Sequence, residues 1–155
     1  MPAIYPFRAV QYNNGEGDVS AKVAPPYDVL NAEQKAAFLK SDPSNVVGID
    51  LPHVPAKELG PKKAYSGAAE SLEKMLSDGT LSRREKPAIF AYRQTFKAEG
   101  KDFQRCGMAC TVDTVAFGPR EGGGVLPHEQ TFSGPKEDRK ALMEATATQL
   151  SPIFG

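Results

Sequence analysis

The sequence has little of what marks several large classes of protein. Lysine plus arginine (19) equals aspartate plus glutamate (19), so no basic excess points to nucleic acid or a membrane surface. No apolar run approaches the roughly 20 residues of a membrane span, and no basic segment followed by an apolar one opens the chain. We therefore expect a soluble, cytoplasmic protein whose partner is a small-molecule substrate, not nucleic acid or a membrane.

Cysteine is scarce as well. The two cysteines, Cys106 and Cys110, fall at even spacing in a strand-like segment, which puts both side chains on one face and too far apart to form a disulfide. They also lack the paired Cys and His residues of a zinc site. We expect two reduced, mostly buried thiols and no metal site formed by them.

Two helices are expected in the first half of the chain. Asn31 can cap a helix over residues 32–40, with Gln34 at the spacing of a capping box. A long helix begins at Gly60-Pro61, where proline is favoured in the first turn. Its apolar residues recur at helical spacing until Asp78-Gly79 provides a stop signal.

A third helix is expected near the end of the chain, over residues 136–149, with Ser133 or Gly134 as its cap. Asp138 lies on the same side as the apolar residues of this helix. We therefore expect the Asp138 side chain to point toward the body of the protein.

Strand signals occupy much of the remaining chain. Residues 4–12 are predicted to form one strand, and the apolar run 45–51 a buried strand. Residues 88–96 and 103–117 have the pattern of a hairpin joined around Glu99-Gly100-Lys101.

These elements predict an α+β fold with a mixed, mostly antiparallel sheet and about three helices. Residues 1–86 are expected to form an N-terminal α/β subregion, and residues 87–155 the hairpin, the last helix and the beginning of a site. The last residues, 150–155, look like the start of another apolar strand. We therefore expect the first part of a longer protein, whose exposed apolar edge could promote self-association into a homo-oligomer.

The stretch 126–139 concentrates the side chains that could carry chemistry. A helix N-terminus favours a phosphate or carboxylate, and Lys136 and Arg139 could neutralise such an anion. Glu129, in the preceding loop, could take a proton from a hydroxyl nucleophile, while His128 could orient Glu129 or act itself. From spacing alone, a surface loop with solvated charges is favoured, because the stretch matches no known phosphate loop, nucleophile elbow or zinc helix.

Polar residues elsewhere have two interpretations each. Residues 23–29 contain two prolines, so a rigid connector with Tyr27 packed on the body is favoured over a loop that presents Tyr27 and Asp28 to a site. Arg105, on a strand, either lies along the sheet or binds a carboxylate or phosphate. His53, in a loop between prolines, is interpreted as a solvated residue without a role. The candidate substrate- or phosphate-binding residues are Ser133, Gly134, Lys136, Asp138, Arg139, Arg105, Tyr27 and Asp28.

Taken together, six segments give the chain a resemblance to a known family from end to end. It resembles the domain of unknown function 1015, also described as SerK-like, whose members are much longer. The segments are Phe7-Arg8-Ala9-Val10, Val23-Ala24-Pro25-Pro26-Tyr27-Asp28-Val29, Asn45-Val46-Val47, Leu126-Pro127-His128-Glu129, Gly134-Pro135-Lys136-Glu137-Asp138-Arg139 and Leu150-Ser151-Pro152-Ile153-Phe154-Gly155.

That family is similar to the free-serine kinases of the ParB/sulfiredoxin-like fold, which transfer a phosphoryl group from ADP or ATP to L-serine. Their Pro-His-Glu-Gln segment is similar to Pro127-His128-Glu129-Gln130. The resemblance thus implies that Glu129 is the catalytic base with His128 beside it, that Mg²⁺ accompanies ADP or ATP, and that a ParB-like element begins near the C-terminal half.

The kinases also carry an Asp-Gly-His-His-Arg motif, which this sequence lacks. We therefore expect the chain alone to be inactive and a longer form to be a small-molecule kinase. Two alternatives stay open, namely a non-catalytic module that senses a nucleotide or amino acid, and a structural domain.

Overall fold

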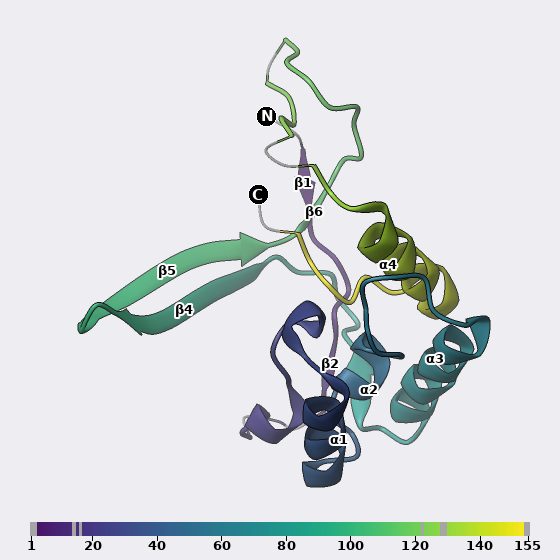
Figure 1. The fold of residues 1–155 in the computed structure, drawn as a ribbon. Coiled ribbons are helices and arrows are strands. Elements are labelled where there is room, and N and C mark those ends of the chain that lie inside the picture. The colour runs from purple at the N-terminus through teal and green to yellow at the C-terminus, as the bar shows by residue number, and fades with distance from the viewer. Residues whose placement is uncertain (1–2, 14, 16, 122, 128–129, 154–155) are drawn as a thin grey trace. The chain divides into compact units, whose positions relative to one another are not determined.

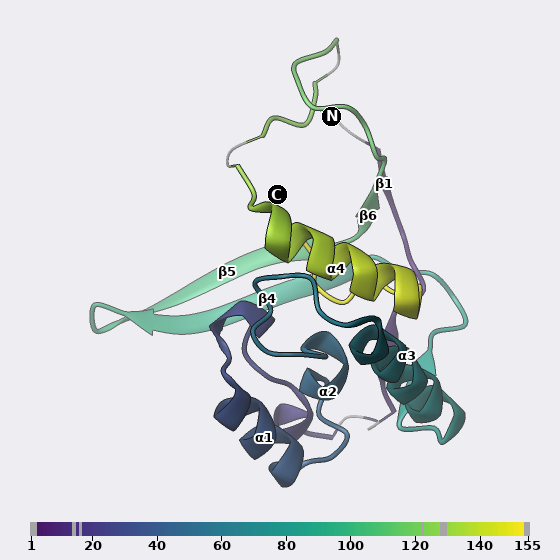
Figure 2. The same cartoon turned by 45° about the vertical axis from the view of Figure 1, so that its right-hand side comes forward.

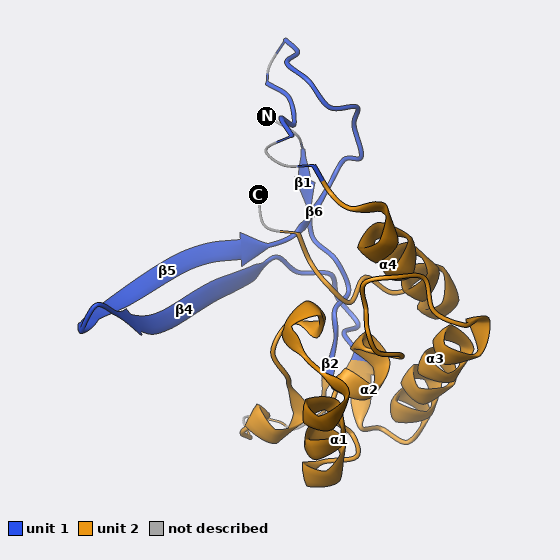
Figure 3. Cartoon of the chain, in the orientation of Figure 1, with its two compact units in different colours: residues 1–11, 83–130 blue, residues 12–82, 131–155 orange. Residues whose placement is uncertain are grey.

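The computed structural model confirms the α+β class, with short antiparallel strand pairs and helices (Figure 1). It divides into two compact units, unit 1 (residues 1–11 and 83–130) and unit 2 (residues 12–82 and 131–155), which are described separately (Figure 3). The predicted division into 1–86 and 87–155 stays a prediction, because compact units and functional domains need not coincide. The structure describes residues 3–13, 15, 17–121, 123–127 and 130–153.

Unit 2 is mainly helical. The helices α3 and α4 pack against each other, and α2 contacts both α3 and α1 (Figures 1 and 2). Its elements are the 3-10 turns η1 (Ser20–Lys22) and η2 (Tyr27–Val29), and the helices α1 (Ala32–Ser41), α2 (Val47–Asp50), α3 (Lys62–Ser77) and α4 (Ser133–Thr146).

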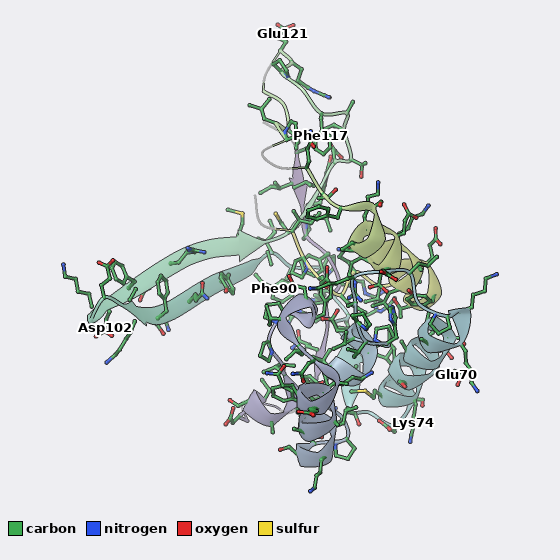
Figure 4. The ribbon with its side chains drawn as sticks, in the orientation of Figure 1. Glu70, Lys74, Phe90, Asp102, Phe117 and Glu121 are labelled. Carbon is green, nitrogen blue, oxygen red and sulfur yellow. The ribbon has the colours of Figure 1, made fainter. Side chains whose placement is uncertain are left out.

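The predictions for α1 and α3 are confirmed. The Asn31 side chain accepts a hydrogen bond from the Gln34 amide at 2.8 Å, and the Gln34 side chain accepts one from the Asn31 amide at 2.9 Å. Glu70 and Lys74 of α3 are exposed and lie on the face opposite to its buried residues (Figure 4). The buried face of α3 consists of Tyr65, Ala68, Leu72 and Met75, at the spacing that the sequence predicted.

The buried strand predicted over residues 45–51 is wrong, because the structure has the short helix α2 there. The buried Asn45 side chain accepts a hydrogen bond from the Val47 amide at 2.9 Å, and it donates to the carbonyl oxygens of Ala21 and Val23 at 2.8 and 2.9 Å. A short apolar run is equally compatible with a strand and a helical turn. Here the bonds of Asn45 stabilise the turn.

Every buried apolar side chain among the described residues belongs to unit 2. Burying a valine, leucine, isoleucine or methionine side chain contributes about 1.5–3 kcal/mol, so the stability of the chain is concentrated in this unit. The set is Val47, Ile49, Leu51, Ala56, Tyr65, Ala68, Leu72, Met75, Leu81 and Leu142.

Unit 1 contains the predicted hairpin, whose second strand ends earlier than expected. The strand β4 (Phe90–Ala98) pairs antiparallel with β5 (Lys101–Ala109). The expectation that both thiols are mostly buried is wrong for Cys106, which is exposed on the two-stranded ribbon; Cys110 is half-buried. Both cysteines are free.

The single strand predicted over residues 4–12 is also wrong. The chain forms β1 (Ile4–Tyr5), which pairs with β6 (Thr111–Val112), and then β2 (Val10–Tyr12), which pairs with β3 (Leu81–Arg83). Pro6 follows β1 and has no amide hydrogen to continue a ladder. Within the described parts of the chain, no helix has the length and apolar character to cross a membrane.

Candidate functional site around Asp138

The predicted catalytic pair, His128 and Glu129, lies outside the described residues, so their roles stay predictions. Arg105 lies in β5 of unit 1, where it is exposed and its guanidinium stands 5.9 Å from the centre of the Phe96 ring. The other candidates all belong to unit 2. Ser133, Gly134, Lys136, Asp138 and Arg139 occupy the first two turns of α4, whereas Tyr27 and Asp28 belong to η2.

The start of α4 differs from the prediction. The helix already includes Ser133, and its N-cap residue, Phe132, forms no capping hydrogen bond through its side chain. Gly134 cannot act as a cap through a side chain; it serves instead for close packing, because a Cβ there would overlap the carbonyl oxygen of Lys57. Lys136 is exposed in the first turn. Ser133 and Lys136 are thus exposed at the helix start, as are Phe132 and Glu137. Pro135 has no amide hydrogen, and the Lys136 amide donates to the Phe132 carbonyl oxygen at 3.4 Å.

Asp138 points into the body of unit 2, as the sequence predicted, and its exposed fraction is 0%. One carboxylate oxygen, Oδ1, accepts a hydrogen bond from the Tyr65 hydroxyl at 2.7 Å and lies 2.6 Å from His53 Nε2. The other, Oδ2, accepts from Arg139 Nε at 3.0 Å and Nη2 at 2.7 Å. Four donor positions thus surround one buried carboxylate, as a buried charge requires.

Arg139 extends this network to α2. Its Nη1 donates to the carbonyl oxygen of Asp50 at 2.7 Å and to Asp50 Oδ1 at 3.1 Å. The Ser151 hydroxyl donates to the same Oδ1 at 3.1 Å. The guanidinium also stands 3.8 Å from the centre of the Tyr27 ring, close enough for a cation–π contact. Arg139 is therefore occupied by two carboxylates and an aromatic ring.

Sequence reasoning missed His53, and the interpretation of this residue as solvated is wrong. Its side chain is 15% exposed, and its ring meets that of Tyr65 edge-on with centroids 5.8 Å apart. Gly60 allows this packing, because a Cβ there would overlap the His53 ring. The Gly60 amide also donates to the Tyr65 hydroxyl at 2.6 Å. The available signal was Asp138 itself, since a carboxylate on the apolar side of a helix needs donors from elsewhere.

The proton positions around Asp138 follow from the contacts. An ionised carboxylate only accepts hydrogen bonds, so His53 Nε2 must carry the proton that it shares with Asp138. In a neutral ring this leaves Nδ1 as the acceptor, and no described residue donates to it. The cluster therefore fixes one tautomer of His53.

The environment shifts the pKa values of the acidic groups in opposite directions. Burial by itself raises the pKa of Asp138, but hydrogen bonds from Tyr65, Arg139 and His53 outweigh it, so this pKa lies below the usual range. Burial raises the pKa of Asp50, and the charge of Arg139 offsets only part of that effect. The pKa of Tyr65 is raised by burial and by its bond to Asp138. Asp138 is thus the carboxylate that the fold stabilises in its charged form.

Tyr27 and Asp28 have different surroundings. Tyr27 is half-buried and packs against the apolar cluster of Val47, Leu51 and Ala56, as a connector residue would, while its ring also contacts Arg139. Burial raises the pKa of its hydroxyl. Asp28 is exposed. The structure therefore gives Tyr27 a supporting role beside Arg139 and leaves Asp28 in solvent.

Within the described part of unit 2, the side chains with potential chemistry gather in this cluster and at the start of α4. Among the described residues, no group of three or more His, Cys, Asp or Glu side chains could hold a metal ion. An apolar groove does exist beside α1, but it contains none of the predicted site residues. It is lined by Pro25, Leu30, Gln34, Ala37, Phe38 and Ser41.

Comparison with known proteins identifies one family. The model of a protein of unknown function, DUF1015, matches residues 4–155, from β1 through the residues that follow α4. Searches among curated proteins and among solved structures returned no significant match. The matched range includes both the Asp138 cluster and the β4–β5 hairpin.

Proposed function

The chain belongs to the DUF1015 family of proteins of unknown function, and from this premise we propose that it forms part of a nucleotide-dependent phosphotransferase. The acceptor is free serine or a similar small molecule with a hydroxyl group. The SerK-like resemblance of Pro127-His128-Glu129-Gln130 supports this reaction class. The expected ParB/sulfiredoxin-like element is part of the same proposal.

The observation that carries the proposal is that some residues of the segment 134–139 are buried for packing whereas others are exposed at the helix start. Gly134 packs on the Lys57 carbonyl, and Asp138 and Arg139 turn inward to form the buried cluster. Lys136 stays exposed in the first turn, where the N-cap residue Phe132 forms no capping bond through its side chain. A helix start that exposes the Lys136 ammonium group suits a phosphate group, because positioning and charge stabilisation dominate phosphoryl transfer.

The proposal assigns different kinds of role to the candidates. Glu129 accepts the proton of the substrate hydroxyl as its oxygen attacks phosphorus, and His128 orients Glu129. Ser133 and Lys136 contact the phosphate. Asp138 and Arg139 act through the position of α4 instead of touching substrate. Arg105, Tyr27 and Asp28 stay predictions as substrate contacts.

ADP or ATP with Mg²⁺ is the proposed phosphoryl donor. The described residues do not supply a metal cage. Magnesium bound to a nucleotide needs only one or two protein carboxylates besides the phosphates, so the proposal assigns no described side chain to the ion. When bound, Mg²⁺ would offset the negative charge of the phosphates.

The test is phosphoserine formation by the product of the complete reading frame, supplied with L-serine, Mg²⁺ and ADP or ATP. We expect Glu129→Gln to lower kcat by about 10²–10⁴-fold, the usual contribution of a positioned base. Lys136→Ala should raise the KM for the nucleotide. Lys140→Ala is the matched control, because Lys140 is an exposed lysine of the same helix that pairs with Glu144 at 3.9 Å.

Absence of product from the wild-type protein, or undiminished product with Glu129→Gln, would refute the proposal. Calorimetry with ADP, ATP, serine and phosphoserine then separates the alternatives. Binding that survives Glu129→Gln without turnover identifies a sensing module. Absence of all binding leaves a structural domain.

A further inference from the structure

The β4–β5 hairpin is a ribbon of two strands that lacks a covering layer among the described residues of unit 1 (Figure 1). Apart from residues at its base and beside its turn, both strands are exposed along their length. Phe96 and Phe103 stack across the strands with ring centroids 5.6 Å apart, yet they remain 39% and 44% exposed. An isolated ribbon of this kind is only marginally stable in water, so a further partner is expected to stabilise it.

The turn defines which backbone groups the ribbon leaves free. Glu99 and Gly100 both have positive φ, 50° and 73°, as in the type I′ turn of a two-residue hairpin. In such a turn the flanking residues, Ala98 and Lys101, form a hydrogen-bonded pair. Pairs with and without mutual hydrogen bonds then alternate along the ladder, so the even-numbered residues of β4 bond to β5. The amides and carbonyls of the odd-numbered β4 residues, such as Thr95, therefore point away from β5.

The outer edge of β4 is complementary to itself. Two copies paired antiparallel about Gln94 overlap over the whole strand and set Tyr92 opposite Phe96 of the second copy. On the other face, Arg93 stands opposite Thr95, so no two like charges are directly opposed. Pairs of aromatic residues across strands contribute favourably, whereas opposed like charges destabilise a sheet.

The outer edge of β5 is not complementary to itself. Full overlap of two β5 strands is centred on Arg105 and sets this cation opposite its own copy. The single aromatic residue of β5, Phe103, would face Gly107. Lys101 adds a second cation to the face that carries Phe103, whereas the corresponding face of β4 has no charged residue.

We propose that the chain self-associates through the outer edge of β4, with a second copy of the same chain as the partner. The two ribbons form a four-stranded sheet in the order β5, β4, β4, β5, with a two-fold axis at Gln94. This proposal is independent of the phosphotransferase proposal, since it uses neither α4 nor the residues around Glu129.

The experiment is sedimentation equilibrium of the full chain with one proline placed in each edge. Thr95 and Gln104 are directly opposite each other in the ribbon, and both amides point outward. Thr95→Pro removes a donor from the β4 edge and should weaken the dimer by about tenfold or more. Gln104→Pro makes the same change in the β5 edge and should leave the dimer unchanged.

Oxidative crosslinking adds a test that does not depend on folding of a proline variant. With Cys106 and Cys110 changed to serine, Gln94→Cys should form an intermolecular disulfide, because paired residues at this position lie about 4.5 Å apart between Cα atoms. Arg105→Cys, at the position that would face its own copy in a dimer through β5, should not crosslink in the same background. A wild-type chain that is monomeric at all concentrations, equal effects of the two prolines, or equal crosslinking at both sites would overturn the proposal.

Discussion

The Asp138 cluster and the β4–β5 hairpin show two different ways in which this chain orders its polar and apolar groups. The cluster gathers α2, the loop after it, α3 and α4 around one carboxylate that is 0% exposed. The hairpin is formed by residues that are neighbours in sequence, and no fully buried apolar side chain is found among its described residues. Removal of one partner should therefore cost much more in the cluster than in the hairpin.

The difference has a physical origin in the cost of burying charge. A carboxylate in the interior is tolerated only when donors surround it, so each partner of Asp138 depends on the others. In the hairpin each side chain keeps contact with water, and its contacts are worth little individually. Four predictions test this contrast, from the largest expected effect to the smallest.

The largest effect is expected from Asp138→Ala. It leaves Arg139 with one carboxylate partner fewer and removes the acceptor of Tyr65 and His53, which should lower the free energy of unfolding by about 3–5 kcal/mol. Urea unfolding followed by circular dichroism measures it. Glu137→Ala, at the exposed neighbouring position, should change this free energy by less than about 0.5 kcal/mol. Similar losses of unfolding free energy in Asp138→Ala and Glu137→Ala would contradict the idea that the buried cluster stabilises the fold more than exposed residues do.

Gly134→Ala should have the second largest effect. The added methyl group overlaps the Lys57 carbonyl oxygen, so the start of α4 must move, at a cost of about 1–3 kcal/mol. Gly67→Ala is the control, because a Cβ at this position in α3 meets nothing within 4 Å. That change should stabilise the helix by about 0.5–1 kcal/mol. Thermal unfolding should therefore show a lower melting temperature for Gly134→Ala and a higher one for Gly67→Ala than for the wild type.

The third prediction concerns pH. The pKa of Asp138 is lowered by folding, so its stabilising contribution is complete above the unfolded value near 3.8 and is lost as the pH falls further. The advantage of the wild type over Asp138→Asn should therefore shrink as the pH falls through the unfolded value of 3.8 and below it, as measured by urea unfolding.

Asp50 provides the control of opposite sign. Burial raises its pKa in the folded state, so the folded protein binds the Asp50 proton more tightly than the unfolded chain does. The wild type should then gain relative to Asp50→Asn as the pH falls. A pH-independent difference for either variant would show that the cluster does not perturb that carboxylate.

The smallest effect is expected in the hairpin. Phe96→Ala removes a stacked but exposed ring and should cost only about 0.2–1 kcal/mol. Hydrogen exchange of the β4 and β5 amides at low protein concentration measures this local loss. Leu72→Ala in the buried face of α3 is the contrasting truncation, with an expected cost of about 2–5 kcal/mol.

Local patterns were sufficient for much of the fold. The capping box at Asn31, the periodicity of α3 and the turn residues around Gly100 each act over a few neighbouring positions, and all three predictions were confirmed. Local patterns could not decide whether the apolar run 45–51 is a strand or a helix, because Asn45 bonds to Ala21 and Val23, more than twenty residues earlier in the chain.

The candidate site shows the same limit. The inward direction of Asp138 followed from its position on the helix, but its partners His53 and Tyr65 come from two other elements. Nothing near His53 in sequence indicates that its partner is Asp138, 85 residues later in the chain. The role of Glu129 as a base rests on the SerK-like resemblance and stays a prediction until turnover is measured.

By itself, therefore, the sequence determined the α+β class, the positions of α1, α3 and the hairpin, and the inward face of α4, because these depend on local hydrogen bonds and on periodicity. Only the tertiary structure decided that residues 47–50 are helical, that His53 is a partner of Asp138, and that Arg139 is held by two carboxylates. These outcomes depend on which distant groups meet in the interior, where a buried polar atom must find a partner.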